Sequence, residues 1–376
     1  MTASTMPAEY SVYRRAAARG LLPDPEIKVS DWAERFRRVA KEEGPHAGRW
    51  RNATAPYLTE IMDCLSPSHP STTVTVMKCI QIGASQCATN WIFYNADKVG
   101  APMMIVHPTV NAGKAWVREK LDPAIRETPR ARRAIFEQKS RDEKGSTSLF
   151  KKFQGGYALI TGANSAADLS QHTVRFLVKD DWDRWPSDVD GQGNPDRMAD
   201  GRIVAYSDLG ISKVLQMSSP GIEGISNVAK AYEASDQRTF LVPCPQCRDG
   251  QHLLWENLKF NLTAPHAPRY ICQDCGFPIE HHHKLPMLRA GGWEAQQPDP
   301  GRQPGFSINA LLNPFTNWDV LVGKFAEDHR NPQTHKTFVN LYLGLPWKEA
   351  GSAPEWTILM RRAADEPAKL RQIPPG

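Results

Sequence analysis

Two pairs of cysteines constrain the fold of this chain more than any other feature of its sequence. The pairs are Cys244 with Cys247 and Cys272 with Cys275. Each pair has C-x-x-C spacing, and 24 residues separate the two pairs. Four thiolates so spaced can occupy the corners of a tetrahedron, which is the coordination that Zn²⁺ prefers. Strand-like stretches at 253–255 and 270–271 fit a hairpin between them. The spacing therefore predicts a structural zinc ribbon with no open coordination position for catalysis.

The composition narrows the class of protein. A chain of 376 residues favours two or three domains. Hydrophobic residues make up 40% and charged residues 23%, which is typical of soluble globular proteins and excludes collagenous, coiled-coil and disordered chains. No run approaches the roughly 18 apolar residues of a membrane span, and the N-terminus lacks the apolar region of a signal peptide. We therefore interpret the chain as intracellular. Because disulfides are rare inside cells, we expect the remaining cysteines, Cys64, Cys79 and Cys87, to be free thiols.

Basic residues gather in two stretches, although the net charge is only +5. The stretches contain Arg35, Arg37, Arg38 and Lys41 near the start, and Arg130, Arg132, Arg133, Lys139, Arg141, Lys144, Lys151 and Lys152 in the middle. Such runs form either a solvated face or a surface that contacts phosphates, and the sequence favours neither.

Residues 1–45 are polar and contain one helical pattern. Trp32, Phe36 and Val39 recur at i, i+4 and i+7, and Ser30 is placed to cap the helix. The neighbouring arginines would lie mostly off this apolar face. The pattern predicts an N-terminal arm with a docking helix.

From about residue 72, strands alternate with helices. The expected strands span 72–77, 103–106, 157–161, 174–178 and 213–217, and the expected helices span 86–96 and 110–125. This alternation predicts an α/β fold with a mostly parallel sheet covered on both faces. In such sheets, ligands bind beyond the carboxyl ends of the strands.

One candidate site is the loop from Lys78 to Ser85, between a strand and a helix. It matches the phosphate-binding pattern G-x-x-x-x-G-K-[ST] in part, because Gly83 and Ser85 are in place. Lys78 stands at the first glycine, and Ala84 stands at the usual lysine. Lys78 could reach back to supply the missing cation. An ordinary strand-to-helix turn is the alternative.

Two further candidates end later strands. Asp180 and Asp181 follow an apolar strand, as do the acids with which ATPases hold Mg²⁺ and polarise water. Ser218-Ser219-Pro220 follows the next strand, where short hydroxyl side chains could sense a γ-phosphate. Each motif taken alone also fits a plain turn.

In these residues the chain resembles the large subunits of phage terminases of the GpA, lambda-like family, which are ATP-driven motors that package double-stranded DNA into procapsids. The resemblance runs from about Trp32 to the C-terminus. It is carried by Gly48-Arg49-Trp50, Pro56-Tyr57-Leu58, Met77 to Ser85, Lys139 to Asp142, Gly162 to Ser165, Val174 to Pro186, Tyr232 to Arg238, both cysteine pairs, Lys336 to Asn340 and Leu343 to Trp347.

The resemblance implies a P-loop fold of the ASCE type that uses ATP and Mg²⁺, with Zn²⁺ in the ribbon. It makes Lys78 the phosphate-contacting lysine, Ser85 and Asp180 the Mg²⁺ ligands, and Asp181 the counterpart of the catalytic glutamate. The implied coupling motif is Ser218 to Pro220. The nucleotide site would comprise Lys78, Gln81, Gly83, Ala84, Ser85 and Gln86, with Trp50 or Tyr57 near the adenine.

The implied partners are double-stranded DNA, the terminase small subunit and the portal protein, in the host cytoplasm and without a membrane. The active form would be a homo-oligomeric ring, in which an adjacent subunit supplies an arginine. The expected division is an arm at 1–45, a motor core at 46–238, a zinc ribbon at 239–295, and a segment at 296–376 that packs on the core.

Three departures from the family pattern qualify this expectation. Asp181 is one methylene shorter than the usual glutamate, and Ala84 replaces a lysine. The third departure is length, because the chain ends at Gly376, where a nuclease domain is expected to begin. We therefore expect the nuclease domain to be absent. The alternative function is a non-catalytic, zinc-stabilised nucleic-acid-binding or assembly module with a degenerate nucleotide site.

Overall fold

The computed structural model describes residues 26–137, 146–299 and 301–349. Several expectations fall outside these ranges: part of the N-terminal arm, the basic residues Lys139, Arg141 and Lys144, the stretch Lys139 to Asp142, and the end of the C-terminal segment. Within the described ranges, no helix is both long enough and apolar enough to span a bilayer.

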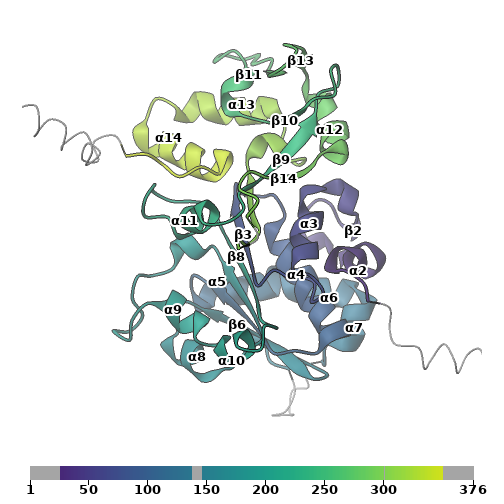
Figure 1. The fold of residues 1–376 in the computed structure, drawn as a ribbon, viewed down its shortest axis with the longest axis vertical. Coiled ribbons are helices and arrows are strands. Elements are labelled where there is room, and N and C mark those ends of the chain that lie inside the picture. The colour runs from purple at the N-terminus through teal and green to yellow at the C-terminus, as the bar shows by residue number, and fades with distance from the viewer. Residues whose placement is uncertain (1–25, 138–145, 300, 350–376) are drawn as a thin grey trace, which may run out of the picture.

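A 10-stranded sheet lies at the centre of the described structure (Figure 1). Its parallel strands are β3 (Thr73–Lys78), β4 (Met103–His107), β6 (Gly156–Gly162), β7 (Phe176–Asp180), β8 (Lys213–Ser218), β9 (Arg238–Pro243) and β15 (Gly305–Ile308). Its antiparallel edge strands are β5 (Phe150–Phe153), β10 (Gly250–His252) and β14 (Gly292–Ala295). The order is β10-β9-β15-β3-β8-β7-β4-β6-β5, with β14 paired to β9. The five predicted strands are confirmed, and β9 and β15 continue the sheet past the expected core boundary at residue 238.

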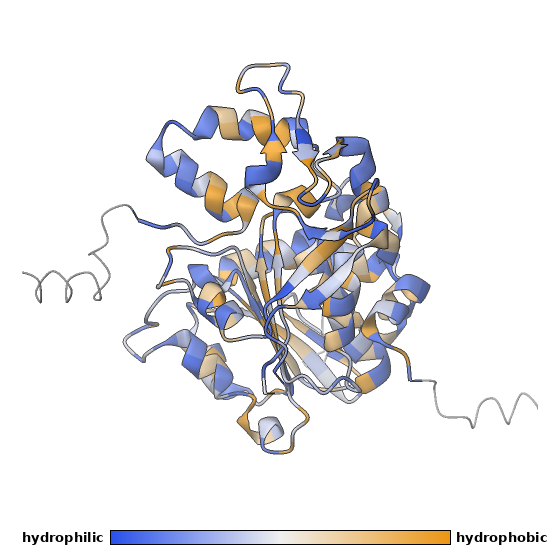
Figure 2. Ribbon diagram, turned by 45° about the horizontal axis from the view of Figure 1, so that its top comes forward, coloured by the Kyte–Doolittle hydropathy of each residue, from blue (hydrophilic) through white to orange (hydrophobic). Residues whose placement is uncertain are grey.

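Both faces of the sheet are buried. The evidence is that alternate residues of one strand belong to different apolar clusters. On β4, Met103 and Ile105 join the large cluster beneath α4 (Ala84–Tyr94), whereas Met104 and Val106 join a second cluster. Successive side chains of a strand point to opposite faces, so this split requires cover on both sides. Figure 2 shows the apolar strands enclosed between helices with polar outer faces. The predicted α/β architecture is confirmed.

Helices lie on either side of this sheet (Figure 1). With α4, one side carries α2 (Val29–Phe36), α3 (Tyr57–Cys64), the π-helical turn η3 (Asn95–Val99), α6 (Asp122–Glu127) and α7 (Pro129–Ala134). α5 (Val110–Trp116) and the π-helical turn η4 (Val117–Leu121) lead into α6. The other side carries α8 (Ala166–Gln171), α9 (Pro195–Asp200), α10 (Val204–Ser207) and α11 (Asn227–Glu233). The helices predicted at 86–96 and 110–125 are confirmed.

Much of the chain after β9 lies in a layer at the top of Figure 1, although β10, β14 and β15 belong to the central sheet. It contains a three-stranded sheet of β11 (Leu258–Lys259), β12 (Arg269–Ile271) and β13 (Pro278–Ile279). Its helices are α12 (Lys284–Ala290), α13 (Trp318–Asp328), α14 (Pro332–Phe338) and the π-helical turn η9 (Val339–Leu343). The strand expected at 270–271 is confirmed. The strand expected at 253–255 is wrong, because β10 ends at His252 and a 3-10 turn, η6 (Trp255–Asn257), follows.

The predicted N-terminal helix exists, but its ends differ from the prediction. α2 stops at Phe36, because Val39 lies in β1 (Arg38–Val39), which pairs with β2 (Gly48–Arg49). Ser30 lies inside the helix, and its hydroxyl donates to the Asp63 carboxylate instead of capping. Contacts with other parts of the chain therefore determine where α2 begins and ends: the Val29 amide donates to the Ser66 hydroxyl at the start, and β1 pairs with β2 after the end.

Arg37 was expected to lie off the apolar face, and this expectation is wrong. Its side chain is fully buried and pairs with Glu43 at 2.5 Å between Nη2 and Oε2. The guanidinium also donates to the side-chain oxygens of Asn90 at 3.1 Å and Gln86 at 3.0 Å. Burial lowers the pKa of Arg37, and the Glu43 carboxylate opposes that effect. This network joins the N-terminal segment to α4.

Removing one partner of this buried pair leaves the other charge without compensation. We expect Glu43→Gln to lower the free energy of unfolding by about 3–5 kcal/mol. The matched control is Glu42→Gln, because the neighbouring carboxylate pairs with Arg126 at the half-exposed surface and should make no measurable difference. Urea denaturation of both variants tests this, and equal effects would show that the buried pair has no special role.

Candidate active site and cysteine cluster

The loop from Lys78 to Ser85 links the end of β3 to the start of α4. Gly83 precedes the helix with φ +87°, and a Cβ there would lie 3.1 Å from Leu58 Cδ1. The left-handed backbone therefore favours glycine at this position, and a larger residue would also have to displace the Leu58 side chain. The first amides of a helix have no intrahelical partner, so those of Ala84 and Ser85 are available to an anion, and the helix dipole favours negative charge there. The loop has the geometry of an anion-binding turn.

The two expected adenine contacts are packed inside the protein. Tyr57 is fully buried, and its hydroxyl donates to the Ile82 carbonyl at 3.0 Å, within the loop. Trp50 is 9% exposed, and its indole N–H donates to Asn52 Oδ1 at 2.7 Å. A base stacks on an exposed ring face, so Tyr57 in this position supports the loop and presents no ring face for stacking.

The Gln86 side chain also turns away from the loop. Its amide donates to Glu43 Oε2 at 2.9 Å and accepts from Arg37, so it belongs to the buried network. Gln81 is exposed, with φ +59°. Ala84 is buried, and Ser85 is partly exposed at the start of α4.

The sheet brings the loop and the predicted acids together. β8 lies between β3 and β7, so the carboxyl ends of the three strands share one edge. Lys78 Nζ lies 3.6 Å from Asp181 Oδ1, and the lysine residue is only 8% exposed. The Asp181 backbone is left-handed, with φ +45°, a conformation that aspartate tolerates better than most residues. The cation and the carboxylate predicted from separate motifs therefore meet at one place.

Asp180 is buried beside His107, the last residue of β4. His107 Nδ1 lies 3.2 Å from Asp180 Oδ2, and the Asp181 amide donates to Asp180 Oδ1 at 3.1 Å. Burial alone would raise the pKa of Asp180. The hydrogen bond from His107 and the charges of His107 and Lys78 outweigh burial, so this pKa lies below its usual value. The carboxylate is therefore ionised at neutral pH.

The predicted coupling motif is tied to the acidic strand by Asp183. The Asp183 amide donates to the buried Ser218 hydroxyl at 3.1 Å. Its carboxylate accepts from the amides of Gly221 and Val228, both at 2.9 Å, and from the Ser226 hydroxyl. The turn after Asp181 and the segment after Ser219 and Pro220 are thus held by one side chain.

Sequence reasoning missed His107 and Asp183. The only sequence signal for them is position, because His107 directly follows the strand predicted at 103–106 and Asp183 follows the paired acids by two residues. His107 and Asp183 can be recognised as site residues only when the order of the strands in the sheet is known, because that order determines which strand ends lie side by side.

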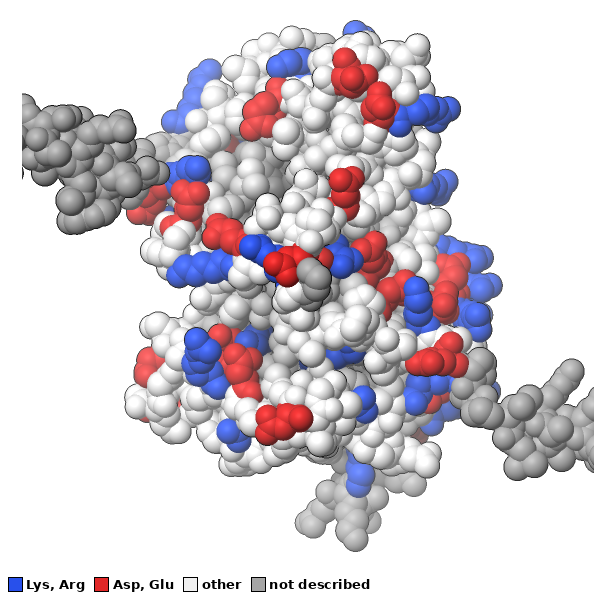
Figure 3. All heavy atoms as spheres, in the orientation of Figure 1, with Lys and Arg blue, Asp and Glu red and all other residues white. Residues whose placement is uncertain are grey.

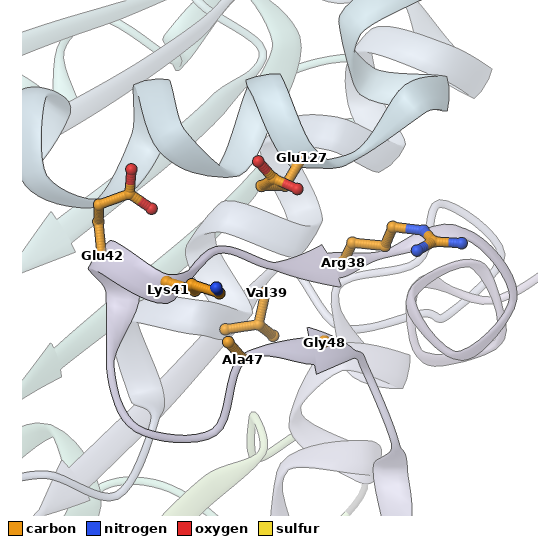
Figure 4. Close-up of a pocket in the computed structure, with 7 residues that line it drawn as sticks. All are labelled: Arg38, Val39, Lys41, Glu42, Ala47, Gly48 and Glu127. Atoms are coloured by element: carbon orange, nitrogen blue, oxygen red, sulfur yellow. The ribbon is translucent and has the colours of Figure 1, made fainter.

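A surface pocket lies away from the carboxyl edge of the sheet and does not include the phosphate loop. Figure 4 shows a pocket between the β1–β2 hairpin and the end of α6. It is lined by Arg38, Val39, Lys41, Glu42, Ala47, Gly48 and Glu127, and by none of residues 78–85. Acidic and basic side chains are interleaved over the face seen in Figure 3.

The basic residues that the structure describes in the predicted stretches do not share one environment. Lys151 is buried and pairs with Asp122 at 2.7 Å, and Arg130 lies 2.9 Å from Asp97. Arg132 and Arg133 are exposed.

The four paired cysteines form a cluster in the upper layer. Cys244 Sγ lies 3.8 Å from Cys275 Sγ, and Cys247 Sγ lies 3.8 Å from Cys272 Sγ. All four sulfurs lie within 4.8 Å of one another. These separations are too long for disulfides, whose sulfurs lie about 2.05 Å apart. The expected free thiols, Cys64, Cys79 and Cys87, are buried and unpaired, and burial raises the pKa of each to about 12.

Comparisons with known proteins identify the family. The family model for "Phage terminase large subunit gpA, ATPase domain" matches residues 44–293. A terminase large subunit from Enterobacteria phage P21 is 27% identical over 397 residues, an alignment that covers 96% of this chain and 60% of that protein. This chain therefore spans about three fifths of the length of that relative.

Solved structures give a weaker likeness. The large terminase ATPase domain of Thermus phage P74-26 is 11% identical, with a TM-score of 0.41, over 81% of this chain and 97% of that one. A point mutant of the same domain gives 12% identity and a TM-score of 0.39, over 74% of this chain and 90% of that one.

The expectation that the nuclease domain is absent is wrong. The family model for "Terminase large subunit gpA, endonuclease domain" matches residues 303–376. The expectation rested on where the chain ends, which carries no physical information about a domain boundary. The matched region already begins in the centre of the structure, because its β15 lies between β9 and β3. With the ATPase-domain match extending over more than half of its residues, the chain belongs to the gpA family of phage terminase large subunits.

Proposed function

We propose that this chain is an ATP-hydrolysing motor that translocates double-stranded viral DNA into procapsids. The observation that carries the proposal is the contact of Lys78 with Asp181 beside the anion-binding turn. Family membership supports it. The proposed partners are the terminase small subunit and the portal protein in the host cytoplasm, with the chain acting as a ring whose neighbouring subunit supplies an arginine. The exposed Arg132 and Arg133 are candidates for DNA contact.

The strand order supports the ASCE type of P-loop fold. In that type, a further strand separates the strand before the phosphate loop from the strand that carries the acids. Here β8 has that position between β3 and β7, and it leads into Ser218. A group at the end of β8 is therefore adjacent to both parts of the proposed site.

Lys78 is proposed to contact the phosphates, although Asp181 holds it in this structure. Binding of ATP would transfer the ammonium from the carboxylate to the phosphate oxygens. Asp181 would then be free to orient the attacking water for in-line displacement. The 38% exposure of the Asp181 side chain, against 11% for Lys78, supports this division of roles, because the carboxylate borders solvent.

Asp180 and Ser85 are proposed to hold Mg²⁺. A carboxylate and a hydroxyl are hard oxygen donors that suit this ion, and the lowered pKa keeps Asp180 ionised. When bound, Mg²⁺ would neutralise charge on the β- and γ-phosphates. His107 orients the carboxylate from the neighbouring strand. The backbone amides of Ala84 and Ser85, together with Gly83 and Gln81, would surround the phosphates. Gln86, which the resemblance also assigns to this site, would support the loop from the buried network instead.

The adenine is proposed to lie near Trp50, because Trp50 retains some exposed surface and Tyr57 has none. Ser218, Ser219 and Pro220 are proposed to couple loss of the γ-phosphate to movement. The Asp183 contacts support this role, since they join the turn of the acids to the segment that follows the motif.

The cysteine cluster is proposed to be a structural zinc ribbon. In a tetrahedron with Zn–S bonds of about 2.3 Å, neighbouring sulfurs lie about 3.8 Å apart. The Cys244–Cys275 and Cys247–Cys272 separations, both 3.8 Å, fit that edge length. Four thiolates would fill the coordination, so the ion would serve the fold only.

We expect Lys78→Ala to reduce Mg²⁺-dependent ATP hydrolysis by about 10²-fold or more, because no other side chain of the loop supplies a cation to the phosphates. Lys324→Ala, which removes an exposed lysine on α13, is the matched control and should keep the wild-type rate. Stimulation by duplex DNA is expected to exceed that by single strands. Wild-type protein that hydrolyses no more ATP than Lys78→Ala would refute the proposed ATPase.

We expect Asp181→Glu to raise kcat by up to about 10²-fold. The extra methylene brings the carboxylate roughly 1 Å closer to the attacking water, and a misplacement of this size can cost that factor. Asp181→Asn, which removes the base, should abolish turnover. If Asp181→Glu changes nothing and nucleotide binding is undetectable, the non-catalytic module would be favoured.

We expect one zinc ion per chain in purified protein, with loss of zinc and of thermal stability in Cys244→Ser. Elemental analysis and thermal unfolding measure the two effects. Cys64→Ser is the matched control, because that buried thiol lies outside the cluster and its loss should leave the zinc content unchanged. Zinc-free wild-type protein with normal stability would contradict the ribbon.

A further inference from the structure

A short segment near the end of the described chain contacts both loops of the proposed site. We call residues 340–347 the bracket. They begin within η9 and lie inside the range that the endonuclease family model matches. Their contacts with the two loops are made mainly by backbone groups, which cannot move independently of the segment.

On one side, the bracket holds the start of the phosphate loop. The Ile80 amide donates to the Leu341 carbonyl at 2.8 Å. Gly344 is buried against this backbone and against the end of β15. A Cβ there would lie 2.8 Å from the Ile308 carbonyl oxygen, 3.0 Å from the Cys79 nitrogen and 3.2 Å from the Lys78 carbonyl carbon. A displacement of the Lys78 or Cys79 backbone would therefore also displace Gly344, because the two backbones are in contact.

On the other side, the bracket holds the segment that follows the coupling motif. The buried Asn340 side chain donates to the Gly221 carbonyl at 2.7 Å and to the Leu345 carbonyl at 2.9 Å. The Trp347 amide donates to the same Gly221 carbonyl at 2.9 Å, and the Trp347 carbonyl accepts from the Glu223 amide at 3.0 Å. The bracket and this segment form one small hydrogen-bonded unit.

We propose that the bracket fixes the spacing between the phosphate loop and the coupling motif, and passes the nucleotide state of the site to the endonuclease-matched region. Asn340 and Gly344 are its positioning residues, and neither is proposed to touch the nucleotide. This inference rests on the proposed ATPase function. Because Gly221 accepts from the bracket while its amide donates to Asp183, the acids, the coupling motif and the phosphate loop are linked in one chain of contacts.

Gly344→Ala tests the contact with the phosphate loop. Gly344 has φ +65°, and its Cβ would press on the loop backbone. Gly210→Ala is the matched control, because Gly210 has φ +68° with nothing within 4 Å of the added Cβ. Both variants place alanine at a similar left-handed φ, so a difference between them reports the contacts of the added Cβ with the loop backbone and with the Ile308 carbonyl at the end of β15. We expect Gly344→Ala to lower kcat/KM for ATP by about 10-fold or more relative to Gly210→Ala. Equal values in an active background would overturn the inference.

Hydrogen exchange of the wild-type chain provides a test that needs no substitution. A non-hydrolysable ATP analogue with Mg²⁺ should slow exchange in the peptide over 339–347 as well as in the peptide over 78–86. In Asn340→Asp, a carboxylate would face the carbonyls of Gly221 and Leu345. The analogue should then no longer slow exchange over 339–347, but it should still slow exchange over 78–86. Protection confined to 78–86 in the wild type would overturn the inference and leave the ATPase standing. Protection of neither peptide would refute the proposed nucleotide site, and the inference with it.

Discussion

The structure depends most on charge compensation at the carboxyl edge of the parallel sheet. Lys78, Asp180 and His107 are all nearly buried. Lys78 is compensated by the Asp181 carboxylate, and Asp180 is compensated by the ring nitrogen of His107. A buried charge without a partner costs several kcal/mol, so the strands must keep their order for the fold to persist. Because each charge at this edge has a partner, phosphate could replace Asp181 beside Lys78, and a cation could bind Asp180, without leaving a charge unpaired.

Much of the fold follows from local pattern, and the exceptions share one cause. The β-branched run at 72–77 and the apolar run at 174–178 predict strands, which the structure has as β3 (Thr73–Lys78) and β7 (Phe176–Asp180). Gly83 and Ser85 indicate the loop between strand and helix. The expectation for Arg37 is wrong and His107 is missed, because their burial depends on Glu43 and Asp180, partners that only tertiary packing brings into contact. Periodicity describes one element at a time and contains no information on which elements become neighbours.

The upper layer is connected to the sheet more closely than a separate ribbon would require. Cys244 follows the last residue of β9 directly, so the cysteine cluster begins where a central strand ends. Trp255 then packs on Phe325 at 5.1 Å and on Phe338 at 5.2 Å between ring centroids. These rings join the segment between the two cysteine pairs to α13 and α14. An aromatic cluster therefore connects this segment to the helices that precede the bracket.

The position of β15 also has a consequence for how the protein is made. β15 pairs with β3 through Gly305 and Thr75, residues far apart in the sequence. During synthesis, β3 leaves the ribosome long before its neighbour on that side exists. Contacts of this sequence separation form slowly, and an unpaired strand edge invites association with other chains. The β15 side of β3 therefore stays unpaired in the nascent protein until residue 308 has emerged, and until then it can pair with the strands of other chains.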